Sequence, residues 1–295
     1  MLKIGIIPNL GKAECPEVFE KLCGLVGGKA KLMVTDEVFE LPGLKAKQNR
    51  KCLLDIAERC NAAFEKAESF FEKADIIVVM GGDGSILRAA SGAAKAGKPL
   101  LGINLGRVGY LASAEKGSLE KVAEKLLSGD YKICEHIMLS TRFEGCETFA
   151  LNDVVVSRSE TGRILEFSLY VDDEFVDKYT ADGMVIATPT GSTAYSLSAG
   201  GPIAYPYMDM LLITPVCPHG LNSRPIVVPA DKKITLRLGD KYDEYKAIVT
   251  ADGQIIHKVS AGDFITVSKA SVKTELIKMN NYGFYDLLRI KLKGN

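Results

Sequence analysis

The sequence lacks a net charge, an apolar run of membrane length and any pairing pattern of cysteines. Its 295 residues include 37 Lys or Arg and 37 Asp or Glu, so the formal charge at pH 7 is zero. This balance argues against a partner recognised by bulk charge, such as duplex DNA or an anionic membrane, but leaves room for a local anion site. No apolar run approaches the roughly 18 residues that cross a membrane. The opening residues 1–5 are typical of a strand and do not have the layout of a signal peptide.

The seven cysteines are an odd number, and none of them forms a CxxC pair. This usage excludes a disulfide scaffold and favours reduced thiols in a cytoplasmic protein. Cys217-Pro218-His219 has too few donors for a metal site, and we identify no metal ligand directly.

The length favours about two domains of roughly 150 residues. Up to residue 130, short apolar runs alternate with helix-like stretches, which predicts an α/β domain with a parallel sheet over residues 1–130. Its predicted strands are 3–7, 75–80 and 99–103, and its predicted helices begin at Pro16, at Cys52 (with helical spacing as far as Phe71), at Ser85 and at Ser118 as an N-cap.

After residue 130 short strands dominate, and turn residues separate them at the spacing of a sandwich. We therefore expect an all-β, sandwich-like domain over residues 131–274. The predicted strands are 148–157, 165–171, 175–179, 184–187, 226–228, 234–238, 247–249 and 264–267, with one short helix at 192–199. Thr-Ala-Asp-Gly occurs at 180–183 and again at 250–253, and Asp-Gly is a preferred hairpin turn.

The most informative motif is Gly81-Gly82-Asp83-Gly84-Ser85, between a predicted buried strand and a predicted helix. Glycines at the carboxyl end of a parallel strand let the backbone approach a ligand, and the N–H groups that begin the next helix suit phosphate oxygens. The motif is neither a Walker loop nor GxGxxG. Because an aspartate repels phosphate, we interpret Asp83 as a proton acceptor for an attacking hydroxyl or as a holder of a divalent cation. The alternative is a helix cap.

Residues 188–201 place hydroxyl side chains beside glycines and Tyr195, which makes a poor core but a good polar pocket wall. A tyrosine face can stack on a planar base, and hydroxyls can donate or accept. The alternative is a hydroxyl-capped helix entered through Thr190-Gly191-Ser192, and both interpretations are compatible.

Asn152-Asp153 lies midway along an otherwise apolar predicted strand. Buried without partners, such groups cost roughly 1–3 kcal/mol each, so they need a ligand or a position at a strand end or bulge. An amide suits a base edge or a ribose, and a carboxylate suits hydroxyl groups.

Together these motifs resemble the NAD kinase family, which uses ATP or polyphosphate to phosphorylate the 2′-hydroxyl of the adenosine ribose of NAD, giving NADP. Residues 104–111, 218–225 and 252–254 extend the resemblance over most of the chain. Gly-Gly-Asp-Gly alone is shared with phosphofructokinases and lipid kinases. The block from Thr188 to Ser196 is the specific part.

The resemblance implies a role for each matching residue. Asp83 corresponds to the proposed catalytic base, and Gly81, Gly82 and Arg88 are expected at the donor phosphates. Asp153 stands where Glu is usual, so its shorter reach is expected to require a water molecule to contact the ribose. The expected NAD-binding residues are Gly84, Asn152, Asp153, Asp182, Thr193, Ala194, Tyr195, Ser198 and His219.

The resemblance also implies Mg²⁺ or another divalent cation with ATP, NAD as substrate, and a homodimer or homotetramer without nucleic-acid or membrane partners. The chain end, residues 275–295, is expected to return to the first domain, and the apolar alternation of 284–291 is a candidate for that return. Arg163, Lys178 and Arg224 are further candidates for phosphate contacts.

Two other functions fit parts of the pattern. A lipid kinase with the same glycine turn would need an apolar tunnel or a membrane-binding face, and no amphipathic or basic membrane stretch is visible. A non-catalytic NAD(P) sensor would have lost the chemistry, and the intact Asp83 argues against it.

Overall fold

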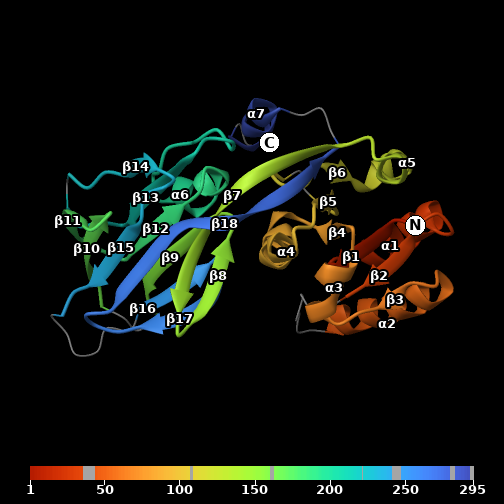
Figure 1. Cartoon of the computed structure of the whole chain (residues 1–295), viewed down its shortest axis with the longest axis horizontal. Helices are drawn as coiled ribbons and strands as arrows, with labels where there is room; N and C mark the ends of the chain where they lie inside the picture. The colour runs from red at the N-terminus through yellow and green to blue at the C-terminus, as the bar shows by residue number, and fades with distance from the viewer. Residues whose placement is uncertain are drawn as a thin grey trace. The chain divides into compact units, whose positions relative to one another are not determined.

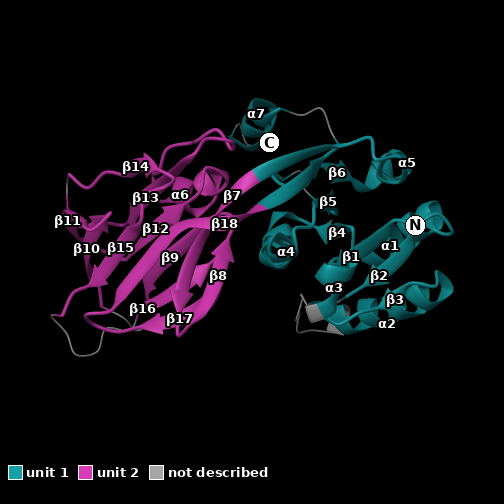
Figure 2. Cartoon of the chain, in the orientation of Figure 1, with its two compact units in different colours: residues 1–135, 274–295 teal, residues 136–273 magenta. Residues whose placement is uncertain are grey.

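The computed structural model describes residues 1–35, 44–106, 109–159, 163–220, 222–240, 247–279 and 283–292. The chain forms two compact units: residues 1–135 with 274–295 make unit 1, and residues 136–273 make unit 2 (Figures 1 and 2). Among the described helices, none combines the length and the apolar character needed to cross a membrane.

Unit 1 contains the predicted parallel sheet. Its strands run in the order β5-β4-β1-β2-β3, and every neighbouring pair is parallel. Strand β4 is buried throughout because helices cover both faces of the sheet, as its continuous β-branched run predicts. The strands of unit 1 are β1 (Lys3–Pro8), β2 (Lys31–Val34), β3 (Ala63–Phe64), β4 (Ile76–Gly81), β5 (Leu100–Asn104) and β6 (Ala114–Glu115).

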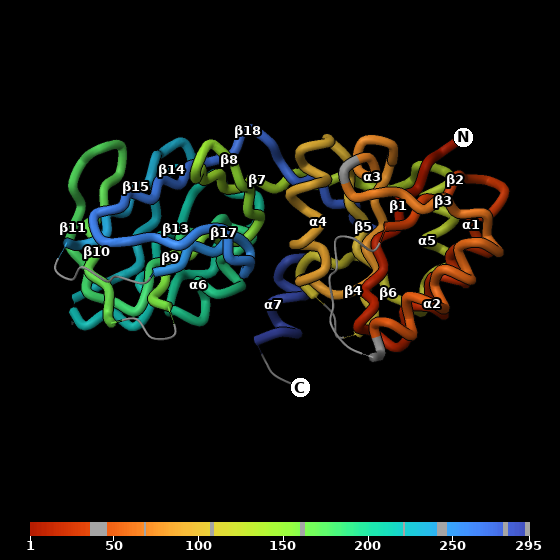
Figure 3. The backbone as a smooth tube through the Cα atoms, turned by 90° about the horizontal axis from the view of Figure 1, so that it is seen from below, coloured from red at the N-terminus to blue at the C-terminus, as the bar shows by residue number. Residues whose placement is uncertain are grey.

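The helices of unit 1 lie on both faces of this sheet. Helix α1 contacts α2 and α5 and shares one apolar core with the sheet, whereas α3 contacts α4 and β1 (Figure 3). A side chain at Gly5 would overlap the Phe70 ring, so this glycine lets α3 lie close to β1. The helices are α1 (Cys15–Val26), α2 (Leu44–Arg59), α3 (Ala67–Lys73), α4 (Asp83–Ala96), α5 (Leu119–Ser128) and α7 (Phe284–Leu292), with a short 3-10 helix η1 (Lys116–Ser118).

Two details of unit 1 differ from the sequence prediction. The helical spacing from Cys52 to Phe71 does not form one helix, because Asn61 adopts a left-handed backbone (φ 53°) and the short strand β3 follows it. Ser118 precedes α5, but its side chain makes no capping bond, because its hydroxyl donates instead to the carbonyl of Glu115.

Unit 2 is built from antiparallel strands, as predicted, and two layers share its apolar core. One layer contains β11-β10-β15-β18 with β7 and β8, and the other is a six-stranded sheet in the order β14-β13-β12-β9-β16-β17. The strands confined to unit 2 are β8 (Cys146–Ala150), β9 (Asp153–Arg158), β10 (Leu165–Val171), β11 (Glu174–Ala181), β12 (Gly183–Ala187), β13 (Met210–Val216), β14 (Ile226–Pro229), β15 (Ile234–Leu238), β16 (Ala247–Ala251) and β17 (Gln254–Val259).

The predicted strand 148–157 is interrupted. Leu151 and Asn152 separate β8 from β9, so the Asn152-Asp153 pair lies at a strand boundary, which was one of the alternatives considered for it. The predicted helix 192–199 is a 3-10 turn, η2 (Thr190–Thr193), followed by one turn of helix, α6 (Tyr195–Ser198).

Two long strands contain the boundary between the units. It falls between residues 135 and 136 in β7 (Lys132–Phe143) and between 273 and 274 in β18 (Phe264–Lys278) (Figure 2). In unit 1, Leu276 of β18 pairs with Leu100 of β5. Strand β18 returns the chain to the sheet, and residues 284–291, which form helix α7 and not a strand, also belong to unit 1.

Candidate active site

The glycine turn lies at the carboxyl ends of the central strands of unit 1. Gly81 ends β4, and a side chain there would overlap Ser85, so the tight passage into α4 requires glycine. After β1, the side-chain amide of Asn9 donates to the Ser85 hydroxyl at 2.8 Å. The backbone N–H of Leu105, which follows β5, donates to the carbonyl of Gly81 at 3.1 Å. Three strand ends therefore fix the turn.

The carboxylate of Asp83 is anchored by backbone and does not cap its helix. It accepts N–H bonds from Tyr110 (2.8 Å), Leu111 (3.1 Å) and Ala112 (3.4 Å), and it makes no capping bond to α4. A side chain at Gly109 would overlap this carboxylate. A carboxylate has about four acceptor positions, so the group is held in place with capacity for a further proton or ion.

The start of α4 offers a cradle for an anion. Gly82 and Gly84 have open space where a side chain would stand, and the first N–H groups of a helix have no partner within it. Arg88 is exposed one turn further along the helix. Of the neighbouring motif at residues 104–111, Arg107 and Val108 lie outside the described residues, as Leu221 does in the motif at 218–225.

In unit 2 the Asn152-Asp153 pair is held by Asp252, which the sequence analysis placed in a turn and in the matching segment 252–254 without a role of its own. The carboxylate of Asp252 accepts the N–H groups of Leu151 (2.8 Å), Asn152 (2.7 Å) and Asp153 (3.3 Å). Asp252 itself begins the two-residue hairpin turn between β16 and β17. The Asp-Gly pair predicted this turn, but no sequence signal connects it to residues a hundred positions earlier.

The Asp153 and Asp252 carboxyl groups are unusually basic for aspartates. Burial, and then the charge of Asp252, raises the pKa of Asp153 to about 7. Burial raises the pKa of Asp252 to about 6, against the opposing effect of its three N–H bonds. Asp153 is 5% exposed as a residue, and its carboxyl group accepts no hydrogen bond from the described residues. Its oxygens keep some contact with solvent, because the Ser159 hydroxyl is the one fully buried side-chain polar atom without a partner among those residues. A carboxyl group that is mostly buried and still open on one side can receive a ligand.

The hydroxyl block separates into a buried set and an accessible set. Thr188 donates to the carbonyl of Leu151 (2.6 Å) and Ser192 to that of Pro189 (2.6 Å), while the Ser196 and Thr214 hydroxyls share a bond of 3.0 Å. These buried side chains build the turn. Gly191 packs so closely on the carbonyl of Asn152 that a side chain there would overlap it. The block is thereby fixed against the Asn152-Asp153 pair.

Four of the expected NAD-binding residues form the accessible set. Thr193 and Ala194 are half-buried, Ser198 is exposed, and Tyr195 is 44% exposed. Burial raises the pKa of Tyr195, and the charges of Cys217, Asp182 and Asp153 raise it further, so these groups lie near the ring. The structure thus gathers most of the predicted NAD-binding residues in one region of unit 2.

Asp182 and His219 occupy the edge of this region. The Nε of Arg158 donates to the Asp182 carboxylate at 2.8 Å, and both side chains are partly exposed. The backbone N–H of His219 bonds to the carbonyl of Thr180 at 2.9 Å, which ties its exposed loop to β11. Of the further candidates, Arg163, Lys178 and Arg224 are exposed. No group of three His, Cys, Asp or Glu among the described residues is arranged to hold a metal ion.

A glycine turn with backbone N–H groups and one anchored carboxylate, at the carboxyl edge of a parallel sheet, is an arrangement that suits a phosphotransferase. Residues 4–131 match the ATP-NAD kinase N-terminal domain, and residues 151–279 match the ATP-NAD kinase C-terminal domain. The chain belongs to the NAD kinase family. Its activity is the ATP-dependent phosphorylation of NAD to NADP.

Similar proteins agree with this assignment. The NAD kinase of Acetivibrio thermocellus is 37% identical over 300 residues, which cover 99% of this chain and 97% of that protein. An NAD kinase of Clostridium botulinum is 43% identical over 222 residues, which cover 74% of this chain and 78% of the other. An NAD kinase from Archaeoglobus fulgidus, solved in complex with ATP, has a TM-score of 0.68 and 29% identity over 88% of this chain and 97% of its own. Yeast NADH kinase, solved with NADH, shares the fold, with a TM-score of 0.85 and 23% identity over 100% of this chain and 88% of its own.

Proposed function

We propose that Asp83 is the catalytic residue and accepts the proton of the 2′-hydroxyl of the NAD adenosine ribose as that oxygen attacks the γ-phosphorus of ATP. The observation that carries this proposal is the anchoring of its carboxylate by three N–H groups beside the first turn of α4. A positioned base contributes about 10²–10⁴ in rate, and most of the remaining acceleration comes from orientation and charge neutralisation.

The donor phosphates bind at Gly81 and Gly82, with Arg88 as a cationic contact. The open space at Gly82 and the N–H groups at the start of α4 support this assignment. ATP is the donor for the family activity, and inorganic polyphosphate is a second donor to be tested at the same subsite.

Magnesium accompanies ATP and neutralises charge on its phosphates. The residues present fit this ion, because Mg²⁺ in kinase sites is usually held by one or two carboxylates together with substrate phosphates and needs no dedicated cluster of protein ligands. Asp83 is the carboxylate at the glycine turn that can supply such a ligand.

NAD is bound by the region around Asn152 and Asp153. The unpartnered Asp153 carboxyl group is suited to a ribose hydroxyl, and the Tyr195 ring to the adenine. Gly84, Asp182, Thr193, Ala194, Ser198 and His219 complete the proposed set of NAD contacts. In this assignment, residues 131–274 form the NAD-binding domain, and residues 1–130 with 275–295 form the domain of the glycine turn.

The enzyme works as a homodimer or homotetramer in the cytoplasm. The family supports the oligomer, and the reduced-thiol pattern of cysteine usage supports the compartment. Size-exclusion chromatography with light scattering tests the oligomeric state directly.

The substitution Asp83→Asn tests the central role. Turnover should fall at least about 100-fold, while the Kd for NAD changes less than about threefold, because the amide keeps the shape but accepts no proton. NADP formation is measured with ATP and Mg²⁺ and, in parallel, with polyphosphate. Asp130→Asn, at an exposed turn, is the matched control and should leave turnover unchanged. Loss of NAD binding by a folded Asp83→Asn enzyme would contradict a purely chemical role.

A further inference from the structure

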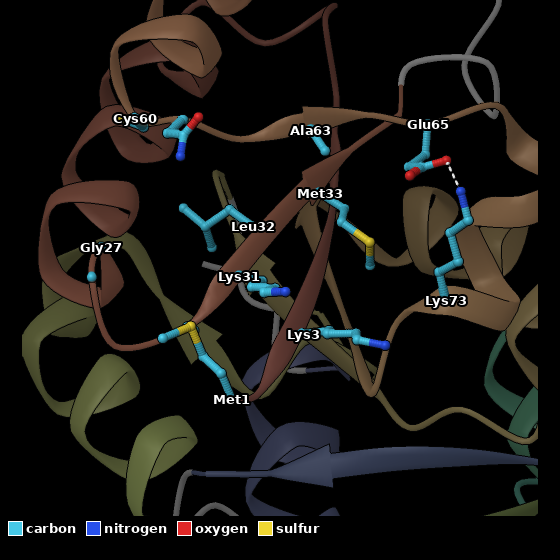
Figure 4. A pocket seen from close by; sticks show the side chains of 13 residues that line it. Met1, Lys3, Gly27, Lys31, Leu32, Met33, Cys60, Ala63, Glu65 and Lys73 are labelled. Atoms are coloured by element: carbon cyan, nitrogen blue, oxygen red, sulfur yellow. Dashed lines mark hydrogen bonds and ion pairs between the residues drawn. The ribbon is translucent and has the colours of Figure 1, made fainter.

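A cavity of about 650 Å³ lies in unit 1 at the amino ends of the first strands (Figure 4). Its walls come from the starts of β1 and β2, the turn after α1, the turn after α2, and the pair Glu65 and Lys73. None of these residues belongs to the motifs that carry the kinase activity. The volume is within the range of roughly 300–1,000 Å³ that is usual for small-molecule sites.

The interior of this cavity is largely apolar. Ala30, Leu32 and Met33 line it and are themselves 7%, 4% and 6% exposed, so their packing fixes the wall. Cys60, which is half-buried, lines the side formed by the turn after α2. A hydrocarbon chain or ring placed against this wall would be removed from water.

Two lysines of the rim, Lys3 and Lys31, carry positive charge on side chains that form no ion pair among the described residues. Lys3 and Lys31 are partners in the parallel register of β1 and β2, and their ammonium groups extend to the same side (Figure 4). Neither lysine forms an ion pair with a described residue. By contrast, Lys73 is paired with Glu65 at 2.6 Å. The nearby Asp75 carboxylate accepts the backbone N–H of Lys3.

We infer that this cavity is a binding site for a small organic anion with an apolar body and one carboxylate or phosphate group. Like charges at directly neighbouring strand positions repel each other, and an anion between Lys3 and Lys31 relieves that repulsion. Met33 is two residues along β2 from Lys31 and on the same face of the strand, so its side chain is the apolar wall that the body of the same ligand meets first. Tight binding therefore requires a ligand with both an anionic group and an apolar body. A phosphate or carboxylate ion alone lacks the apolar contact, and a neutral alcohol lacks the charge.

The site is separate from the glycine turn. Lys3 and Lys31 lie at the amino ends of parallel strands, whereas Gly81 ends β4 at the opposite edge of the sheet, about 20 Å away along a strand at 3.3 Å per residue. Ligand bound in the cavity therefore does not occupy the glycine turn.

Calorimetric titration of the full-length enzyme with octyl phosphate tests this inference. The double variant Lys3→Gln/Lys31→Gln should raise the Kd at least tenfold. The control Lys51→Gln/Lys121→Gln removes the same charge from exposed positions that do not line the cavity and should leave the Kd unchanged. Inorganic phosphate and octan-1-ol should each bind the wild type at least tenfold more weakly than octyl phosphate. Saturating NAD or ATP should not change the Kd.

Alkylation of Cys60 by iodoacetamide, followed peptide by peptide, locates the bound probe. Octyl phosphate should slow alkylation of Cys60 at least fivefold and leave that of the exposed Cys146 in unit 2 unchanged. Any one of four results overturns the inference: no saturable binding, equal weakening in both double variants, displacement by NAD or ATP, or no protection of Cys60.

Discussion

The buried pair Asp153 and Asp252 predicts that unit 2 becomes less stable as the pH rises from 5 to 7. Burial raises the pKa of Asp153 to about 7 and that of Asp252 to about 6, from an ordinary value of 3.8. Above pH 4 the unfolded chain has released protons that the folded chain still holds. The free energy of unfolding therefore falls as the pH rises, until the pH reaches the pKa that the group has in the folded state.

The size of this effect follows from the pKa of Asp153. One proton held by the folded state alone changes the free energy of unfolding by 1.36 kcal/mol for each pH unit. Between pH 5 and pH 7, Asp153 therefore contributes a loss of about 2–3 kcal/mol, which is close to a 100-fold change in the unfolding equilibrium. Asp153→Asn cannot titrate and removes this contribution.

Native-state hydrogen exchange, measured on peptides from β9 and β16, reads the stability of unit 2 directly. Comparing wild type with Asp153→Asn at each pH cancels the pH dependence of the exchange chemistry itself. From pH 5 to pH 7 the opening free energy of the wild type should fall by about 2–3 kcal/mol relative to that of Asp153→Asn. Asp177→Asn, at an exposed position of β11, should follow the wild type. Parallel curves for wild type and Asp153→Asn would refute the reasoning.

Three further substitutions test the two anchored carboxylates and the pocket wall. Gly109→Ala places a side chain where the Asp83 carboxylate lies and should lower kcat about 100-fold. The control Gly117→Ala has open space around the new side chain and should leave kcat unchanged. Steady-state kinetics measures both variants. Asp252→Ala deprives three backbone N–H groups of their acceptor and should lower the free energy of unfolding by about 3–6 kcal/mol. Urea unfolding measures this loss. A loss below about 1 kcal/mol would show that water replaces the carboxylate. Tyr195→Ala should raise the KM for NAD about tenfold with little change in kcat, and a fall in kcat alone would contradict adenine stacking.

The sequence predicted the features that depend on local pattern. The β-branched run before Gly81 predicted a strand buried on both faces, and the glycine turn predicted a site at its carboxyl end. The helix predicted from Cys52 is confirmed as far as Arg59, but its continuation to Phe71 was wrong, because the backbone turns at Asn61 while the apolar spacing goes on. Spacing records which side chains are apolar, and it does not record where the backbone turns.

The parts of the site that could not be predicted depend on contacts between distant segments. The sequence identified Asn152 and Asp153 as polar residues that need partners. It did not identify Asp252 as the group that holds their N–H groups, because the three residues meet only when β9 pairs with β16. In the same way, nothing near Asp83 in the chain indicates that residues 110–112 fix its carboxylate.

The passage of β18 from one unit into the other has a consequence for synthesis on the ribosome. The first unit is discontinuous in the chain, and the edge of β5 at Leu100 obtains its partner only when Leu276 has been made. Leu276 is made 176 residues after Leu100, so at roughly 5–20 residues per second this end of β5 waits on the order of 10–30 s for its partner. Strand β6 already pairs with Ile103 and Asn104 at the other end of β5. Unit 2, which is continuous, is completed before the last strand of unit 1, and the amino end of the β5 edge is open to wrong pairing in the interval.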